Sequence, residues 1–216
     1  MRFKDRADAG RRLAEKLGHY RGKDPLILAI PRGGVPIGRT IADSLGGELD
    51  VVLVHKLGAP DSREFAIGSI SEDGRIELGP YAREPYVSPA DLQAVIRVEA
   101  AVLKQRRALY TPVKAPAEPR GRITIVVDDG LATGHTMMAA LKSLRPRNPA
   151  RLVVAVPVSP PDTLKRVKVL ADEAVCLFAP ELFGAVGRFY ENFAAVSDEE
   201  VVERLREPQP VRQEPA

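Results

Sequence analysis

Residues 123–137 read ITIVVDDGLATGHTM, and this stretch decides what kind of fold the chain forms. It begins with five apolar or β-branched residues, as does a strand that is buried on both faces of a parallel sheet. Two adjacent acids, Asp128 and Asp129, follow directly. The small residues from Gly130 to Thr136 then lead into an apolar helix pattern. The order of strand, acids, loop and helix is typical of one unit of an α/β sheet.

The same stretch carries side chains that suit a phosphorylated sugar. Neighbouring side chains at a strand end diverge, so the carboxylates of Asp128 and Asp129 can reach two adjacent ribose hydroxyls. Gly134 permits a tight turn, and the first N–H groups of the following helix attract an anion. Thr133 and Thr136 add hydroxyl donors. The pattern therefore predicts a sugar-phosphate site, and it lacks the spacing of a Walker loop.

Four further apolar runs resemble the first and extend the predicted sheet. They cover residues 26–30, 51–54, 152–156 and 174–177. Helical patterns separate the runs, which indicates an α/β fold with a parallel five-stranded sheet flanked by helices. Residues 56–121 are an insertion, in which we expect a hairpin over 66–78 and a long helix over 88–110. Residues 1–206 are predicted to form a single domain, with a disordered tail over 207–216.

The pattern V-V-D-D-x-x-A-T-G-x-T over residues 126–136 resembles the signature of type I phosphoribosyltransferases. These enzymes bind 5-phosphoribosyl 1-pyrophosphate (PRPP). The resemblance implies that Asp128 and Asp129 are catalytic, hold the ribose hydroxyls and contact Mg²⁺ indirectly. It also implies a loop that binds the 5-phosphate, made of Ala132, Thr133, Gly134, His135 and Thr136.

Residues 29–38, AIPRGGVPIG, resemble the pyrophosphate loop of the same family. Arg32, Gly33 and Gly34 would bind the pyrophosphate through a guanidinium and backbone N–H groups. In the family this loop can contain a non-proline cis peptide bond. Lys56 follows the second apolar run, where related enzymes often place a cation, and we assign it to the pyrophosphate as well. The alternative interpretation of residues 32–34 is a glycine-rich turn with a solvated arginine. The alternative interpretation of Lys56 is a solvated lysine at a strand end.

Two later segments complete the implied site. Residues 60–70, PDSREFAIGSI, occupy the place of the family's mobile catalytic loop, from which Glu64 could enter the closed site. Residues 178–197 are predicted to form a hood over the accepting base. The stacking candidates within this hood are Phe183, Val186 and Tyr190. The alternative interpretation of the hood residues is ordinary core packing. The alternative interpretation of Glu64 is an exposed charge on a loop.

The resemblance implies Mg²⁺-dependent transfer of phosphoribose from PRPP to a nitrogenous base or related nucleophile, or the reverse reaction. Enzymes for 6-oxopurines commonly carry Asp where this chain has Ala132, which argues against those bases. A looser likeness to uncharacterised bacterial phosphoribosyltransferases lies in K-L-G-x-P from Lys56 and E-x-A-I-G from Glu64. A PRPP- or nucleotide-binding regulator without turnover is the alternative hypothesis.

Composition limits the remaining function classes. The chain has 32 Lys and Arg against 29 Asp and Glu, and this near-balance gives no reason to expect nucleic acid as a partner. The single cysteine, Cys176, cannot form an internal disulfide, which fits a reducing compartment. No apolar run reaches the ~18 residues needed to cross a bilayer. We therefore expect a cytoplasmic protein whose partners are PRPP and a nucleobase-like molecule; the resemblance suggests a homodimer.

Overall fold

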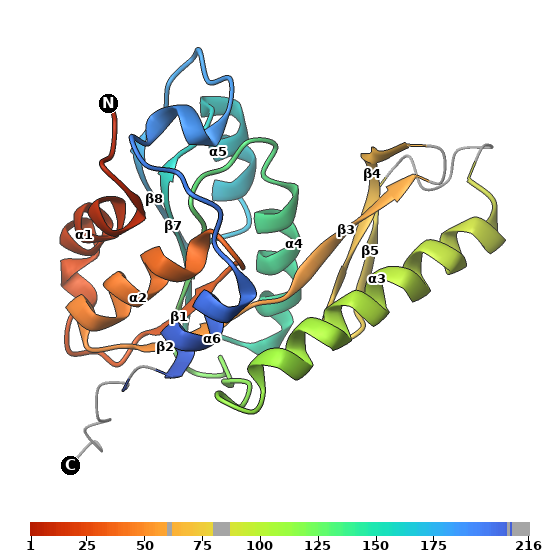
Figure 1. Ribbon diagram of the computed structural model, residues 1–216, viewed down its shortest axis with the longest axis horizontal. Coiled ribbons are helices and arrows are strands. Elements are labelled where there is room, and N and C mark those ends of the chain that lie inside the picture. The colour runs from red at the N-terminus through yellow and green to blue at the C-terminus, as the bar shows by residue number, and fades with distance from the viewer. Residues whose placement is uncertain (60–61, 80–86, 207, 209–216) are drawn as a thin grey trace.

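The structure is a computed structural model that describes residues 1–59, 62–79, 87–206 and 208, with the backbone alone for residues 62–66. Five parallel strands form the central sheet in the order β2–β1–β6–β7–β8 (Figure 1). Their bounds are β2 Glu48–Val51, β1 Leu26–Ala29, β6 Ile123–Val127, β7 Arg151–Val158 and β8 Glu173–Phe178. The predicted fold class, a parallel five-stranded sheet flanked by helices, is confirmed.

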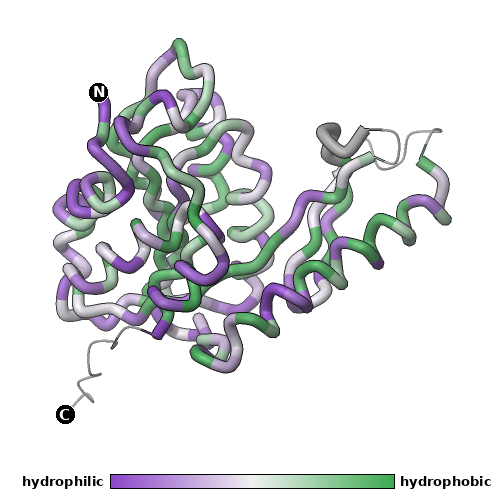
Figure 2. The backbone as a smooth tube through the Cα atoms, viewed as in Figure 1, coloured by the Kyte–Doolittle hydropathy of each residue, from purple (hydrophilic) through white to green (hydrophobic). Residues whose placement is uncertain are grey.

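Helices cover both faces of this sheet. They are α1 Arg6–Lys16, α2 Gly34–Leu45, α4 His135–Leu144, α5 Pro161–Lys168 and α6 Asp198–Arg206. Alternate residues of a strand point to opposite faces. In β1, Ile27 and Ala29 therefore pack into the apolar cluster under α1 and α2, whereas Leu26 and Leu28 pack into the cluster under α4 and α5. Because both faces are apolar, much of the tube through the central sheet is green in Figure 2.

A second, antiparallel sheet stands beside the first in the order β3–β4–β5. Its strands are β3 Val54–Ala59, β4 Ser62–Ser71 and β5 Ile76–Leu78, and the helix α3 Pro89–Tyr110 runs alongside it (Figure 1). We call β3, β4, β5 and α3 the inserted unit. The predicted hairpin and long helix are both present, and the side chain of Ser88 accepts the Asp91 N–H at the helix start.

The predicted second strand over 51–54 was wrong in its bounds. The sheet strand is β2, Glu48–Val51, and the apolar run continues past it into β3, which belongs to the second sheet. Val52, Leu53 and Val54 are buried because the chain passes between the two sheets at this point. A continuous apolar run does not reveal where one sheet ends and the next begins.

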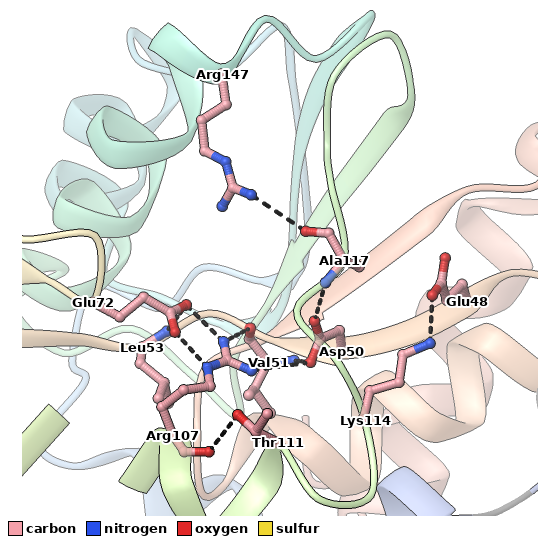
Figure 3. Close-up of polar contacts among 10 residues, drawn as sticks. All are labelled: Glu48, Asp50, Val51, Leu53, Glu72, Arg107, Thr111, Lys114, Ala117 and Arg147. Atoms are coloured by element: carbon pink, nitrogen blue, oxygen red, sulfur yellow. Dashed lines mark hydrogen bonds and ion pairs between the residues drawn. The ribbon is translucent and has the colours of Figure 1, made fainter. Parts of the chain in front are cut away.

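Polar contacts fasten α3 to the central sheet (Figure 3). Nη2 of Arg107 donates to Glu72 Oε1 at 2.7 Å and to the Val51 carbonyl at 3.2 Å. Its Nη1 lies 3.6 Å from Oδ1 of Asp50, a side chain that is 2% exposed. Burial raises the pKa of Asp50, against the hydrogen bond from the Ala117 N–H and the charge of Arg107. One arginine thus joins the inserted unit to β2.

The segment after β8 lies over the N-terminus of the chain. It contains a short 3₁₀ helix, Val186–Phe189, and two more 3₁₀ turns occur at Gly18–Tyr20 and Arg145–Arg147. Phe3 exchanges backbone hydrogen bonds with Phe189 and Glu191, both at 2.8 Å. The N-terminal residues therefore hold the predicted hood in place. Of the tail predicted over 207–216, only Pro208 lies within the described residues.

Candidate functional site

The acid pair lies at the carboxyl end of β6, in the middle of the sheet. Oδ1 of Asp128 accepts the Asp129 N–H at 2.8 Å. Burial, and next the charge of Asp129, raise the pKa of Asp128 well above its usual value. The two acids are half-buried, and burial favours the neutral form of each carboxyl.

Arg6, the first residue of α1, holds the second acid. Its Nε and Nη2 donate to Oδ2 of Asp129 at 3.0 and 2.8 Å, and Nη1 donates to the Ala194 carbonyl at 2.8 Å. The guanidinium lies 4.1 Å from the centroid of the Phe193 ring. Burial raises the pKa of Asp129, and Arg6 opposes that shift. Arg6 was not among the predicted site residues, because no local sequence pattern links it to an acid 123 residues away.

The loop after β1 meets the acid pair. The Pro31–Arg32 peptide bond is cis. A Cβ added at Gly33 would overlap the carboxylate of Asp129, and one added at Gly34 would lie 2.6 Å from the Val127 carbonyl oxygen. Only glycine lets the chain approach the end of β6 so closely. The two sequence segments that resemble the phosphoribosyltransferase loops are therefore side by side.

Residues of α5 support the loop between the acids and α4. Gly134 has φ +74° and precedes the first helical residue. Thr163 Oγ1 donates to the Ala132 carbonyl at 2.9 Å, and Nη2 of Arg166 donates to the Thr133 carbonyl at 3.0 Å. These two hydrogen bonds fix the position of the loop. The first N–H groups of α4 have no partner within the helix and are therefore available to an anion.

Cations gather around this loop. Ala132, Thr133 and His135 are exposed and Thr136 is half-buried. Although the residue is exposed, partial covering of its ring lowers the pKa of His135, and the charges of Arg166 and Lys56 lower it further. Both cations thus lie close to the start of α4, which suits a phosphate. Arg166 and Thr163 were not predicted, because their part in the loop arises only when α5 packs beneath it.

Of the predicted pyrophosphate residues, Lys56 lines a cavity of about 550 Å³ between the central sheet and the inserted unit, which we call the α3 cavity. Pro31, Lys56 and Thr136 are among its lining residues. Arg32 is exposed, and its Nη1 lies 3.8 Å from Oδ2 of Asp198. The backbone of Glu64 is in β4, and its side chain lies outside the described residues.

The hood residues differ in their availability. Tyr190 is 1% exposed, its hydroxyl donates to the Asp129 carbonyl at 2.6 Å, and the rings of Phe3 and Phe193 lie 5.5 and 5.0 Å away. We therefore revise its predicted role: as placed, Tyr190 supports the acid pair and has no open face for a base. Phe183 and Val186 are half-buried, and Val186 packs against Gly130, beside the acids.

A resident metal site is not evident in the described part of the chain. Within it, no three His, Cys, Asp or Glu side chains come together as a metal site requires. Asp128 and Asp129 offer a cation two carboxylates, of which one is already bound by Arg6. Likewise, the described helices include none with the length and apolar character to span a membrane.

A sheet with a glycine-rich loop after β1, and with an acid pair and a small-residue loop after β6, has the arrangement of α/β proteins that bind ligands at the carboxyl ends of their strands. The family model of the phosphoribosyl transferase domain matches residues 3–189. The chain belongs to this family.

Individual relatives agree with this assignment. Two curated proteins, "Putative phosphoribosyl transferase MT0597" and "Putative phosphoribosyl transferase Rv0571c", come from two strains of Mycobacterium tuberculosis. Each is 43% identical to this chain over 201 residues, which are 93% of this chain and 45% of the relative. The chain thus spans less than half the length of these relatives. The crystal structure of TT1426 from Thermus thermophilus superposes with a TM-score of 0.85 at 44% identity, covering 96% of this chain and 99% of that one.

Proposed function

We propose that this chain transfers the phosphoribosyl group of PRPP to a nitrogen nucleophile and releases pyrophosphate. The observation that supports this function best is the contact between the two loops. Gly33 and Gly34, after β1, lie against the carboxylate of Asp129 and the end of β6. A ligand that carries a ribose, a 5-phosphate and a diphosphate could occupy the acid pair, the α4 loop and the β1 loop together.

The acid pair would act on the ribose. In the transfer, the bond from C1 to the pyrophosphate oxygen breaks and its electron pair leaves with the pyrophosphate. The acceptor nitrogen supplies the pair for the new bond to C1 and gives up its proton to water. Positive charge develops on the ring between these events, and the carboxylates of Asp128 and Asp129 would stabilise it while they hold the 2- and 3-hydroxyls.

The diphosphate would be neutralised by Arg32, Lys56 and the N–H groups of Gly33 and Gly34. We propose that Mg²⁺ arrives bound to the diphosphate, because the described residues provide no cluster of three ligands for it. When bound, the ion would add positive charge at the leaving group. Its contact with Asp128 and Asp129 would be indirect.

The acceptor would lie between the ribose and the hood. Phe183 and Val186 keep partly exposed apolar surface there, and Val186 packs against Gly130 next to the acids. This chain has the exposed Ala132 at the position where phosphoribosyltransferases that act on 6-oxopurines commonly carry Asp. We therefore propose a nucleobase-like acceptor without naming the base. The same site could catalyse the reverse reaction. We also propose that the protein is cytoplasmic and forms a homodimer.

The test is calorimetric titration with PRPP and Mg²⁺, followed by pyrophosphate release with a panel of bases. The doubly substituted variant Asp128→Asn, Asp129→Asn should lose turnover by about a hundredfold or more, with an unchanged circular dichroism spectrum. PRPP binding without turnover on any base would favour the regulatory alternative. Undiminished turnover in the double variant would refute the assignment of the site.

A further inference from the structure

The α3 cavity has two walls of different origin. The central domain contributes Pro31, immediately before Arg32, and Thr136, in the first turn of α4. The inserted unit contributes the remaining lining residues, from β3 and α3. They include three polar side chains that the proposed function does not use or explain: His55, Glu99 and Arg106.

These three side chains are hydrogen-bonded in a row. Nη1 of Arg106 lies 3.0 Å from Nε2 of His55, and Oε2 of Glu99 lies 2.7 Å from Nδ1 of His55. A guanidinium can only donate, so Nε2 of His55 accepts and carries no proton. The remaining ring proton is then on Nδ1, where it is donated to Glu99. Glu99 and His55 together hold the Arg106 guanidinium through a neutral ring.

Arg106 therefore keeps its full positive charge at the cavity. In the described part of the chain, its only side-chain hydrogen-bond partner is the neutral ring of His55, and no carboxylate forms an ion pair with it. The next residue, Arg107, is bound by Glu72 in contrast. The rest of the α3 wall is apolar and includes Val95 and Val98. A charge held beside an apolar wall acts more strongly on a ligand than the same charge in water.

The neighbours of Arg106 indicate what it binds. The cavity borders Pro31 of the pyrophosphate loop, Thr136 of the phosphate loop and Lys56. None of the hood candidates, Phe183, Val186 and Tyr190, is among its lining residues. The geometry thus places Arg106 on the side of the phosphate groups, away from the predicted acceptor. Two cations at one open cavity, Lys56 and Arg106, suit a ligand with several negative charges.

We propose that Arg106 of α3 binds the diphosphate group of the substrate, and that His55 and Glu99 are positioning residues for it. This inference rests on the proposed function and extends the diphosphate site from Lys56 of β3 to the helix α3. The inserted unit then supplies one wall of the active site. A guanidinium can bind two oxygens of a diphosphate at once, in a geometry that lysine cannot provide.

The experiment compares the affinities of three probes by calorimetry: PRPP, inorganic pyrophosphate and ribose 5-phosphate, each with Mg²⁺. Arg106→Gln should weaken binding of PRPP and pyrophosphate about tenfold to a hundredfold. The affinity for ribose 5-phosphate should change less than about twofold, because that probe lacks the diphosphate. An unchanged affinity for ribose 5-phosphate also shows that the variant is folded. Arg97→Gln removes the same charge from an exposed position of α3 outside the cavity, and should leave all three affinities unchanged.

The positioning residues have a separate readout. His55→Leu removes the acceptor for Arg106 and should weaken PRPP and pyrophosphate binding but not ribose 5-phosphate binding. His55→Gln retains an acceptor oxygen and should restore most of the loss. Equal diphosphate affinities in Arg106→Gln and Arg97→Gln would overturn the proposal for α3 while leaving the proposed function intact. Failure of the unsubstituted protein to bind PRPP would instead refute the proposed function.

Discussion

The loops at the carboxyl ends of β1 and β6 and the inserted unit are held in place by different means. The loops lie on a sheet whose two faces are covered by apolar clusters, and glycines let them approach one another closely. In α3, by contrast, only Leu103 and Tyr110 are buried. Polar contacts from Arg106 and Arg107 help to fix this helix. The central domain thus holds its loops by apolar packing and close backbone approach, while the helix of the inserted unit combines partly buried apolar residues with a few polar contacts.

The largest effect on stability is expected where the inserted unit joins β2. Arg107→Met leaves the buried Asp50 and the half-buried Glu72 without their cation, which should lower the free energy of unfolding by about 3 kcal/mol. Urea denaturation measures the change, and hydrogen exchange should show the loss concentrated in the inserted unit.

Two controls sharpen this first prediction. Lys104→Met removes a charge from an exposed position of α3 and should be close to neutral. Adding Asp50→Asn to Arg107→Met should recover part of the stability, because the buried charge is then absent. An equal loss from Lys104→Met would contradict the role given to Arg107.

A smaller effect is expected where the core loops meet. Gly34→Ala places a Cβ 2.6 Å from the Val127 carbonyl oxygen, a backbone atom that cannot move aside easily. We expect a loss of about 1–3 kcal/mol in thermal or urea unfolding, together with reduced PRPP affinity. Gly18→Ala is the control, since an added Cβ there meets nothing within 4 Å. Similar stabilities of the two variants would show that the loop has room to adjust.

Arg6 gives a prediction about pH. Its charge lowers the pKa of Asp129 against the effect of burial, so Arg6→Gln should raise that pKa further. Because the ionised carboxylate is the form that stabilises the ribose cation, the acid limb of kcat/KM should move to higher pH in the variant. Activity should recover as the pH rises. A profile that falls uniformly at every pH would indicate a structural role alone.

The smallest effect is expected at the outer edge of the second sheet. Lys142 of α4 pairs with Glu77 of β5, and both side chains are more than 40% exposed. Solvent-exposed pairs contribute little, so Glu77→Gln should change the free energy of unfolding by less than about 0.5 kcal/mol. A loss near that of Arg107→Met would mean that this contact, too, fixes the inserted unit.

The sequence by itself determined the elements whose signals are local. The run over 123–127, the acids after it and the small-residue loop before α4 predicted a strand, a ligand site and a helix; the structure contains both the strand and the helix. The hairpin and the long helix of the insertion were also readable, from turn residues and from the start signal at Ser88. Such features depend on residues only a few positions apart, and for that reason periodicity and turn chemistry reveal them.

Tertiary structure alone decided which distant side chains surround the acid pair. The pairing of Arg6 with Asp129 joins residues 123 positions apart, and Tyr190 became buried support when the N-terminus packed against the hood. The run over 51–54 proved to be a passage between two sheets, because apolar residues satisfy either environment. Arg106 lines the α3 cavity only because α3 packs beside β3, where His55 meets it. These contacts follow from how the elements pack, and sequence spacing does not encode them.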